Sequence, residues 1–200
     1  MKTGILGGTF DPVHLGHIAI AEEARVSQRL SEVIMMPAGQ PAIKQKDEVT
    51  PAEHRLRMLR LAIEGRPGLR VSEMEINRPG PSYTVNTLAQ LRNSSGTDRD
   101  LYFIIGWDSL IQIPEWREPS RIIEMCKLIA VPRPGYRRPD MKKLEGAIPG
   151  ISVKTILLDK PLIDVSASAI RKMVANSESV ESLVPPSVAE YIRKHNLYHK

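Results

Sequence analysis

Short apolar runs alternate with segments of helical periodicity along the chain, and this alternation constrains the fold more than any other feature. The run Leu101–Ile105 contains only aliphatic and aromatic side chains and ends at Gly106, which is typical of a parallel strand with helices on both faces. Further strands are expected at Lys2–Leu6, Glu32–Pro37, Leu69–Ser72, Lys127–Pro132 and Ile151–Leu158. Strands that alternate with helices over short connections predict an α/β fold with a doubly wound parallel sheet.

Helices are expected between these strands, where apolar residues recur at a spacing of three or four. They lie at Leu15–Leu30, Thr50–Gly65, Tyr83–Leu91, Arg121–Cys126, Ser166–Ala175 and Ser187–His195. The second has the clearest start, with Thr50 as its N-cap, Pro51 as its first residue and Glu53 completing a capping box. The polar stretch Ala38–Val49 is expected to be a loop, and Pro134–Pro149 a surface insertion.

The size and composition of the chain limit the classes of protein to consider. Its 200 residues fit one domain with a sizeable core, in which residues 166–200 form a helical C-terminal part. The single cysteine, Cys126, excludes an intramolecular disulfide and a four-cysteine zinc site, and it is expected in the core. We see neither a signal segment nor an apolar stretch of roughly 18 residues, so a soluble cytoplasmic protein is expected. The net charge of +5 favours anionic partners.

The segment Gly7–His17 (GGTFDPVHLGH) leads from the first strand into the first helix. Gly7 and Gly8 let the backbone approach a ligand closely and adopt strained turn conformations. The helix N-terminus after them presents free N–H groups and the positive end of the dipole, which suits a phosphate. His14 and His17 are three residues apart, so both imidazoles should face one side of the first turn. The segment therefore predicts a site at which two imidazoles donate hydrogen bonds to phosphate oxygens.

Other interpretations of this segment fit the residues less well. Gly4, Gly7 and Gly8 lack the G-x-G-x-x-G spacing of a dinucleotide-binding turn, and the Gly-Lys-Ser/Thr of a P-loop does not occur in the sequence. A zinc pair from His14 and His17 has no persuasive third ligand, so no metal ligands are expected in the protein. The structural alternative is that both histidines merely cap the helix.

Taken together, the motif G-G-T-F-D-P-V-H-L-G-H resembles the signature of the nucleotidylyltransferase superfamily, which is marked by H-x-G-H. The segment Val165–Arg171 (VSASAIR) resembles the I-S-S/T-x-x-I-R motif of the same superfamily. This segment is another entry into a helix, with hydroxyls at the N-terminus and an arginine one turn in, which suits the β- and γ-phosphates of a triphosphate. The resemblance implies a Rossmann-like nucleotidylyltransferase fold in a single domain.

Between these motifs the chain resembles the bacterial nicotinate-mononucleotide adenylyltransferase family, from Gly4 to about Tyr198. The similar segments are Met36–Lys44 (MPAGQPAIK), Pro81–Leu88 (PSYTVNTL), Phe103–Leu110 (FIIGWDSL), and Trp116 with the turn Arg133–Gly135. The resemblance implies transfer of an adenylyl group from ATP to nicotinate mononucleotide, giving deamido-NAD and pyrophosphate in NAD biosynthesis. It also implies Mg²⁺ carried by the ATP phosphates, allows a homo-oligomer and gives no role to nucleic acid or membranes.

The resemblance also implies roles for individual residues. Catalytic roles fall to His14, His17, Lys44 and Arg171, with the two histidines at the α-phosphate and the other two at the departing pyrophosphate. ATP is expected to contact Gly7, Gly8, Thr9, Phe10, Gly106, Asp108, Arg133, Ser166, Ser168 and Arg171, of which Gly106 and Asp108 hold the ribose.

The pyridine nucleotide is expected to meet Thr84, Trp116 and Arg117, with the indole stacked on its ring. A half-exposed surface tryptophan and a plain helix-terminal hydroxyl are the structural alternatives for Trp116 and Thr84. Two departures from the family's pattern affect this region. Ala42 and Ile43 replace a proline and a histidine of the loop, and Arg117 replaces a tyrosine, so the pocket is less aromatic but more positive.

Two other adenylyltransferases remain as alternatives, with phosphopantetheine or nicotinamide mononucleotide as the acceptor. Two further alternatives come from different classes of protein: a catalytically inactive nucleotide sensor and a nucleic-acid-binding module. The second would require basic residues interleaved with aromatics on one surface, and Arg133, Arg137 and Arg138 form the only dense basic cluster in the sequence.

Overall fold

The structure is a computed structural model that describes residues 1–41, 49–95 and 99–199. Its strands are β1 (Lys2–Gly8), β2 (Glu32–Pro37), β3 (Gln40–Pro41), β4 (Leu69–Val71), β5 (Pro81–Ser82), β6 (Asp100–Gly106), β7 (Lys127–Val131) and β8 (Thr155–Leu157). Its helices are α1 (Leu15–Ser27), α2 (Ala52–Ile63), α3 (Thr84–Ser95), α4 (Trp107–Gln112), the 3₁₀ turn η2 (Ile113–Glu115), α5 (Pro119–Met125), α6 (Met141–Ala147), α7 (Ile151–Lys154), α8 (Ala167–Ala175) and α9 (Pro186–Lys194). None of the described helices is long and apolar enough to cross a membrane.

Six of the strands form one parallel sheet in the order β4-β2-β1-β6-β7-β8. The chain runs outward from β1 through β2 to β4, returns to the middle at β6, and then runs outward in the other direction. The predicted doubly wound parallel sheet is therefore confirmed. A second, two-stranded parallel sheet of β3 and β5 was not predicted from the sequence, because each strand has only two residues.

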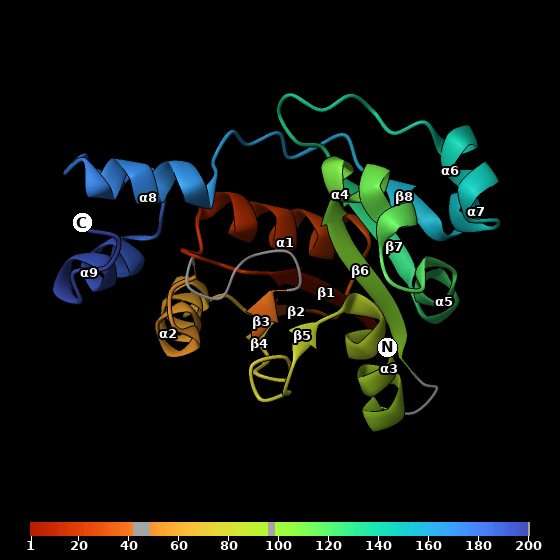
Figure 1. Cartoon of the computed structure of the whole chain (residues 1–200), viewed down its shortest axis with the longest axis horizontal. Helices are drawn as coiled ribbons and strands as arrows, with labels where there is room; N and C mark the ends of the chain where they lie inside the picture. Colours follow the sequence, from red (N-terminus) through yellow and green to blue (C-terminus); the bar gives the residue numbers. More distant parts are fainter. Residues whose placement is uncertain (42–48, 96–98, 200) are drawn as a thin grey trace.

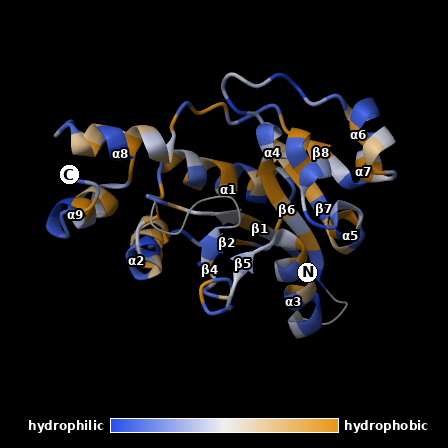
Figure 2. Cartoon of the chain, in the orientation of Figure 1, coloured by the Kyte–Doolittle hydropathy of each residue, from blue (hydrophilic) through white to orange (hydrophobic). Residues whose placement is uncertain are grey.

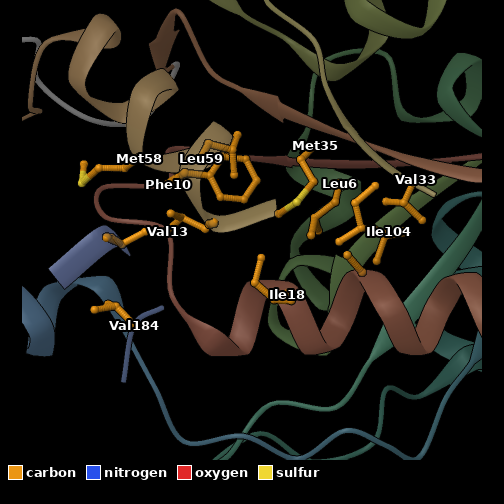
Figure 3. Packing of buried hydrophobic residues seen from close by; sticks show 14 of the residues in the cluster. Leu6, Phe10, Val13, Ile18, Val33, Met35, Met58, Leu59, Ile104 and Val184 are labelled. Atoms are coloured by element: carbon orange, nitrogen blue, oxygen red, sulfur yellow. The ribbon is translucent and has the colours of Figure 1, made fainter. Parts of the chain in front are cut away.

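Helices cover both faces of the large sheet (Figure 1). Because neighbouring residues on a strand point to opposite faces, the strands divide their side chains between two buried clusters. Ile5, Ile34 and Phe103 belong to the cluster under α3, α4 and α5, whereas Leu6, Met35 and Ile104 belong to the cluster under α1, α2, α8 and α9. Figure 2 shows the hydrophobic colouring of β6, and Figure 3 shows Leu6, Met35 and Ile104 in the second cluster with Ile18 of α1.

The cysteine lies in the core, as the sequence predicts. Cys126 is buried in the first cluster, and burial raises the pKa of its thiol to about 12. The helices α8 and α9 supply most of the regular structure after residue 166, and α9 packs on α2 at one end of the molecule (Figure 1).

The expected surface insertion at Pro134–Pro149 is wrong in its second half, which forms α6. The side chain of Asp140 caps this helix by accepting hydrogen bonds from the backbone N–H groups of Lys142 and Lys143. Leu144 and Ile148 are buried in the first cluster, and α6 packs on α7 instead of standing out from the core. Only two apolar residues of this second half, Leu144 and Ile148, are buried, and two positions are too few to reveal a helical period among the prolines and lysines.

The expected strand Ile151–Leu158 is half helix, because its first residues form α7. The carboxylate of Glu145 accepts hydrogen bonds from the backbone N–H groups of Gly150 and Ser152, at 2.6 and 2.9 Å, and so satisfies the start of the helical turn. Only Thr155–Leu157 pairs with β7. The apolar alternation of the segment did not reveal this contact, because Glu145 comes from the preceding helix.

The expected N-cap of α2 is also wrong, since the helix begins one residue later, with Pro51 at the cap position. Thr50 is used differently. Its N–H donates to Asp11 Oδ2 at 3.2 Å, and its carbonyl accepts from Arg55 Nε at 2.8 Å. The bond to Asp11, 39 residues away, and the local bond from Arg55 hold Thr50 outside the helix.

Candidate functional site

The site predicted from the sequence lies where the order of the strands reverses. β1 and β6 are neighbours in the middle of the sheet, and the connections after them leave in opposite directions. Ligands bind doubly wound sheets at such a point, outside the carboxyl ends of the strands. The segments after Gly8 and Gly106 both begin there, so the fold brings two of the predicted motifs to one edge.

His14 and His17 lie together at the start of α1, as the spacing predicted. Their rings stack with centroids 3.7 Å apart and an interplanar angle of 28°. The backbone N–H of His14 donates to Nδ1 of His17 at 3.2 Å. Because Nδ1 of His17 accepts this bond, a neutral His17 carries its proton on Nε2, and Nε2–H can then donate to a ligand.

The two histidines are held in their uncharged forms. Burial, with a smaller contribution from the positive charge of Arg133, lowers the pKa of His14 to about 4. Burial, His14 and Arg133 together lower the pKa of His17 well below its usual 6.5. Neutral imidazoles that face an arginine are poised to gain charge when an anion binds, since an anion favours their protonated forms.

The strain in this turn falls on Phe10 and not on the two glycines, which corrects the sequence-based expectation. Gly7 and Gly8 are the last residues of β1, whereas Phe10 has a left-handed φ of +51°. Its ring is buried and lies edge-on to His17, with centroids 4.8 Å apart. A bulky residue keeps this sparsely populated conformation only where packing enforces it, as is common at functional sites.

The N-terminus of α1 is less open than the sequence predicted. The N–H of Leu15 donates to the carbonyl of Leu183 at 2.9 Å, and the N–H of His17 donates to the carbonyl of His14 at 3.0 Å. The expectation of free N–H groups is therefore wrong for these two residues. At this end of α1, the imidazoles of His14 and His17 are therefore better placed to donate to a ligand than the backbone N–H groups of Leu15 and His17.

The second motif reaches the first turn through Arg171. Its Nη1 donates to the backbone carbonyl of Asp11 at 2.7 Å, and its Nη2 donates to Ser168 Oγ at 3.4 Å. Ser166 caps α8 by accepting a hydrogen bond from the N–H of Ala169. Residues separated by about 160 positions thus meet at one place, as required for two segments that hold one triphosphate.

Asp108 lies at the start of α4, directly after β6. Its Oδ2 accepts a hydrogen bond from Arg133 Nη1 at 2.6 Å. Its Oδ1 is buried and has no hydrogen-bond partner among the described residues. A side chain at Gly106 would overlap this oxygen, so glycine is required there for the carboxylate to fold back over the end of β6. The helix α4 itself was not predicted from the sequence.

The residues expected at the pyridine ring lie around α3 and η2. Thr84 is the first residue of α3, and Trp116 follows η2 with its ring edge-on to Phe103, at a centroid distance of 6.3 Å. The guanidinium of Arg117 lies 4.9 Å above the ring of Tyr83. This cation–π contact joins the segment of Thr84 to the segment of Trp116.

Lys44, with Ala42 and Ile43, lies outside the described residues. Within residues 1–41, 49–95 and 99–199, no group of three or more His, Cys, Asp and Glu side chains could hold a metal ion.

Sequence reasoning missed a polar cluster behind the first turn, in which Asp11 and Arg55 are buried and Tyr198 is half-buried. One signal for Arg55 was present, because it shares helical spacing with the buried Leu59 and Ala62 and places a charge in an apolar stripe. Tyr198 gave no such signal, since its partner Asp11 is 187 residues away.

Comparison with known proteins gives consistent results. Residues 5–173 match the family model described as cytidylyltransferase-like. A protein of Dehalococcoides mccartyi called "Probable nicotinate-nucleotide adenylyltransferase" is 48% identical over 200 residues, which cover 100% of this chain and 98% of the relative. A protein of Roseiflexus sp. with the same description is 44% identical, over 98% of this chain and 96% of the relative.

Solved structures are similar in fold. The nicotinic acid mononucleotide adenylyltransferase of Plasmodium falciparum, complexed with APC, superposes with a TM-score of 0.81 at 20% identity, over 98% of this chain and 96% of that chain. The same enzyme complexed with NaAD gives a TM-score of 0.80 at 20% identity, over 98% and 97% of the two chains.

Proposed function

Because the chain belongs to the cytidylyltransferase-like family and, within it, to the nicotinate-nucleotide adenylyltransferases, we propose that it transfers the adenylyl group of ATP to nicotinate mononucleotide. The products are deamido-NAD and pyrophosphate, and the reaction serves NAD biosynthesis. The curated relatives are similar over nearly the whole chain, and the similar structures were solved with nucleotide ligands, as their descriptions state.

The stacked pair of His14 and His17 is the observation that carries the proposal. The 5′-phosphate of nicotinate mononucleotide attacks the α-phosphorus of ATP in line, a bond to the attacking oxygen forms, and the bond to the pyrophosphate oxygen breaks. The substrate phosphate is already anionic, so no nucleophilic side chain is required. His17 donates from Nε2–H to an α-phosphate oxygen, because its Nδ1 is occupied by the N–H of His14. The contribution of the protein is positioning and electrostatic stabilisation.

The remaining ATP contacts come from residues at the carboxyl ends of β1, β6 and β7 and from the N-terminal part of α8. Arg171, Ser166 and Ser168 receive the β- and γ-phosphates, which is supported by the bond from Arg171 to the first turn. Asp108 accepts a hydrogen bond from a ribose hydroxyl through Oδ1, which has no partner among the described residues, while Arg133 donates to its Oδ2. Gly7, Gly8, Thr9 and Phe10 contribute backbone to the same site, and Lys44 stays a predicted contact of the departing pyrophosphate.

Thr84, Trp116 and Arg117 receive the pyridine nucleotide. The indole stacks on the pyridine ring, and the positive charge of Arg117, held over Tyr83, favours an acceptor that bears a carboxylate. This preference distinguishes nicotinate mononucleotide from nicotinamide mononucleotide, which lacks the charge.

The expected Mg²⁺ would be held by the phosphates of ATP and not by a cage of protein side chains. This ion commonly uses substrate phosphates with few protein carboxylates, which suits the scarcity of such clusters in the described part of the chain. Held there, the ion would supply positive charge that lowers the repulsion between the triphosphate and the attacking phosphate. The consumption of ATP supports the expected cytoplasmic location, and homo-oligomerisation stays a prediction.

The experiment that tests the function measures pyrophosphate release from ATP and Mg²⁺ with each of three acceptors. We expect turnover with nicotinate mononucleotide and much less with nicotinamide mononucleotide or phosphopantetheine. Preferred turnover with either of the other acceptors would refute the assignment of the acceptor. Binding of ATP without turnover on all three acceptors would identify a nucleotide sensor.

The role of His17 is tested by His17→Ala. Loss of one donor to a charge that grows in the transition state lowers kcat by about 10²- to 10³-fold. The matched control is His195→Ala, because His195 lies at the exposed end of α9 and contacts Tyr191, not the first turn. A near-normal rate in His17→Ala would exclude the proposed contact.

A further inference from the structure

A buried polar cluster lies behind the first turn and is centred on Asp11. Its Oδ1 accepts a hydrogen bond from the hydroxyl of Tyr198 at 2.8 Å, and its Oδ2 accepts from the N–H of Thr50 at 3.2 Å. Its backbone carbonyl accepts from Arg171 at 2.7 Å. Asp11 is only 2% exposed. One residue of the first motif therefore connects α8, the start of α2 and the C-terminal end of the chain.

Arg55 of α2 forms the other half of this cluster. It is 1% exposed, and Nη1 donates to the carbonyls of Thr9 at 2.9 Å and Ala38 at 2.8 Å. Nε donates to the carbonyl of Thr50 at 2.8 Å, and Nη2 reaches the carbonyl of Gly39 at 3.4 Å. A buried guanidinium with four backbone carbonyls has its donors well occupied, and it fixes the segments that follow β1 and β2 against the start of α2.

The two halves attract each other electrostatically. The negative charge of Asp11 opposes the lowering of the Arg55 pKa by burial, which shows that the carboxylate and the guanidinium act on each other. Burial and Asp11 raise the pKa of Tyr198, so its hydroxyl remains protonated and can donate. The loss of one partner of a buried charged group lowers the free energy of unfolding more than the same loss at the surface, because water cannot replace the missing hydrogen bond. The positions of these groups are therefore strongly coupled.

We propose that Asp11, Arg55 and Tyr198 form a positioning cluster that sets the first turn against Arg171, so that the C-terminal end of the chain is needed for the geometry of the triphosphate site. None of the three touches the reacting atoms. Tyr198 holds the side chain of Asp11, the backbone of Asp11 orients Arg171, and Arg55 holds the carbonyl of Thr9 beside them. The inference rests on the proposed function, since the effect of the cluster is measured as the rate of adenylyl transfer.

Tyr198→Phe tests the cluster, because it removes one hydroxyl and keeps the ring. We expect kcat for adenylyl transfer to fall by about 10- to 100-fold, since a misplacement of about 1 Å at a reacting group has this order of effect. The ATP dissociation constant, measured by calorimetry on the full chain, should rise. The KM for nicotinate mononucleotide should not change, because the acceptor pocket lies around α3 and η2.

Tyr191→Phe is the matched control. It also removes a hydroxyl that joins the C-terminal region to the start of α2, in this case the 3.0 Å hydrogen bond between Tyr191 Oη and His54 Nδ1. It should lower the melting temperature by an amount similar to Tyr198→Phe while leaving kcat and ATP affinity unchanged. Equal losses of kcat in the two variants would overturn the proposal, because the effect would then come from stability alone.

A double variant, Tyr198→Phe with Asp11→Asn, supplies a second measurement. If both residues act through one cluster, the double variant should be about as slow as the slower single variant, whereas independent losses would multiply and overturn the proposal. Unchanged kcat and ATP affinity in Tyr198→Phe would also overturn it and leave the proposed function intact. A wild-type chain that binds ATP without adenylating any acceptor would refute the function, and weaker ATP binding by Tyr198→Phe would still support the cluster.

Discussion

Acidification should destabilise the folded chain through His14 and His17, whose pKa values are both lowered by burial, and replacement of His14 by asparagine should remove the share that belongs to His14. Burial lowers the pKa of His14 from 6.5 to about 4, so below pH 6.5 the unfolded chain binds a proton that the folded chain does not. The free energy of unfolding therefore falls as the pH drops from 6.5 to about 4, and the loss is complete below the folded-state pKa. At about 1.36 kcal/mol per pKa unit, His14 alone contributes roughly 2 kcal/mol of loss between pH 8 and pH 5, and roughly 3 kcal/mol at pH 4.

Urea unfolding at pH 8, 6.5 and 5 measures this contribution. Between pH 8 and pH 5, the free energy of unfolding should fall further in wild type than in His14→Asn. The difference between the two falls should approach roughly 2 kcal/mol. Val13→Ala is the matched control, because Val13 is buried beside His14 and carries no titratable group. It should lower the free energy of unfolding by a similar amount at every pH. Equal slopes in wild type and His14→Asn would refute the argument from burial.

The other predictions concern the two substrate sites separately. Gly106→Ala places a methyl group against Asp108 Oδ1, so the carboxylate must move away from Arg133, and the KM for ATP should rise by about 10-fold or more while the KM for the acceptor stays constant; a normal KM for ATP would show that Asp108 does not bind this substrate. Trp116→Ala should raise the KM for nicotinate mononucleotide by about 5- to 100-fold through the loss of one stacking contact. If steady-state kinetics instead show weaker use of ATP, the pyridine pocket has been assigned to the wrong residues.

The central strands were predictable because their signal is local. β2 and β7 lie where the apolar runs placed them, to within a residue, since strands buried on both faces need uninterrupted apolar side chains. The sequence around α6 and α7 was harder, because a carboxylate one element away, Glu145, decides where the second helix begins. Periodicity does not contain such contacts, and the short segments β3 and β5 have too few residues to show any period.

The candidate site divides along the same line. His14 and His17 were predictable as a pair because a spacing of three residues at the start of a helix places both side chains on one side of its first turn, whereas the stacking of their rings was not predicted. The strain at Phe10 was not predictable, since it depends on the packing of the ring beneath the turn. The contact of Arg171 with Asp11 follows from the fold of the whole chain, and only the resemblance of both motifs to one superfamily indicated that they meet.

The arrangement of the sheet separates the phosphate chemistry from the choice of acceptor. The residues proposed for ATP follow β1, β6 and β7 or begin α8, and the cluster of Asp11, Arg55 and Tyr198 ties this half to both ends of the chain. The residues proposed for the pyridine nucleotide lie around α3 and η2 and are joined by the contact of Arg117 with Tyr83. Among the described residues, Arg117 makes no hydrogen bond to the histidines or to Arg171. A substitution at Arg117 can therefore change the acceptor while those three residues keep their places. The departure of Arg117 from the family's tyrosine is thus expected to alter KM for the acceptor and to leave the chemistry at the α-phosphate intact.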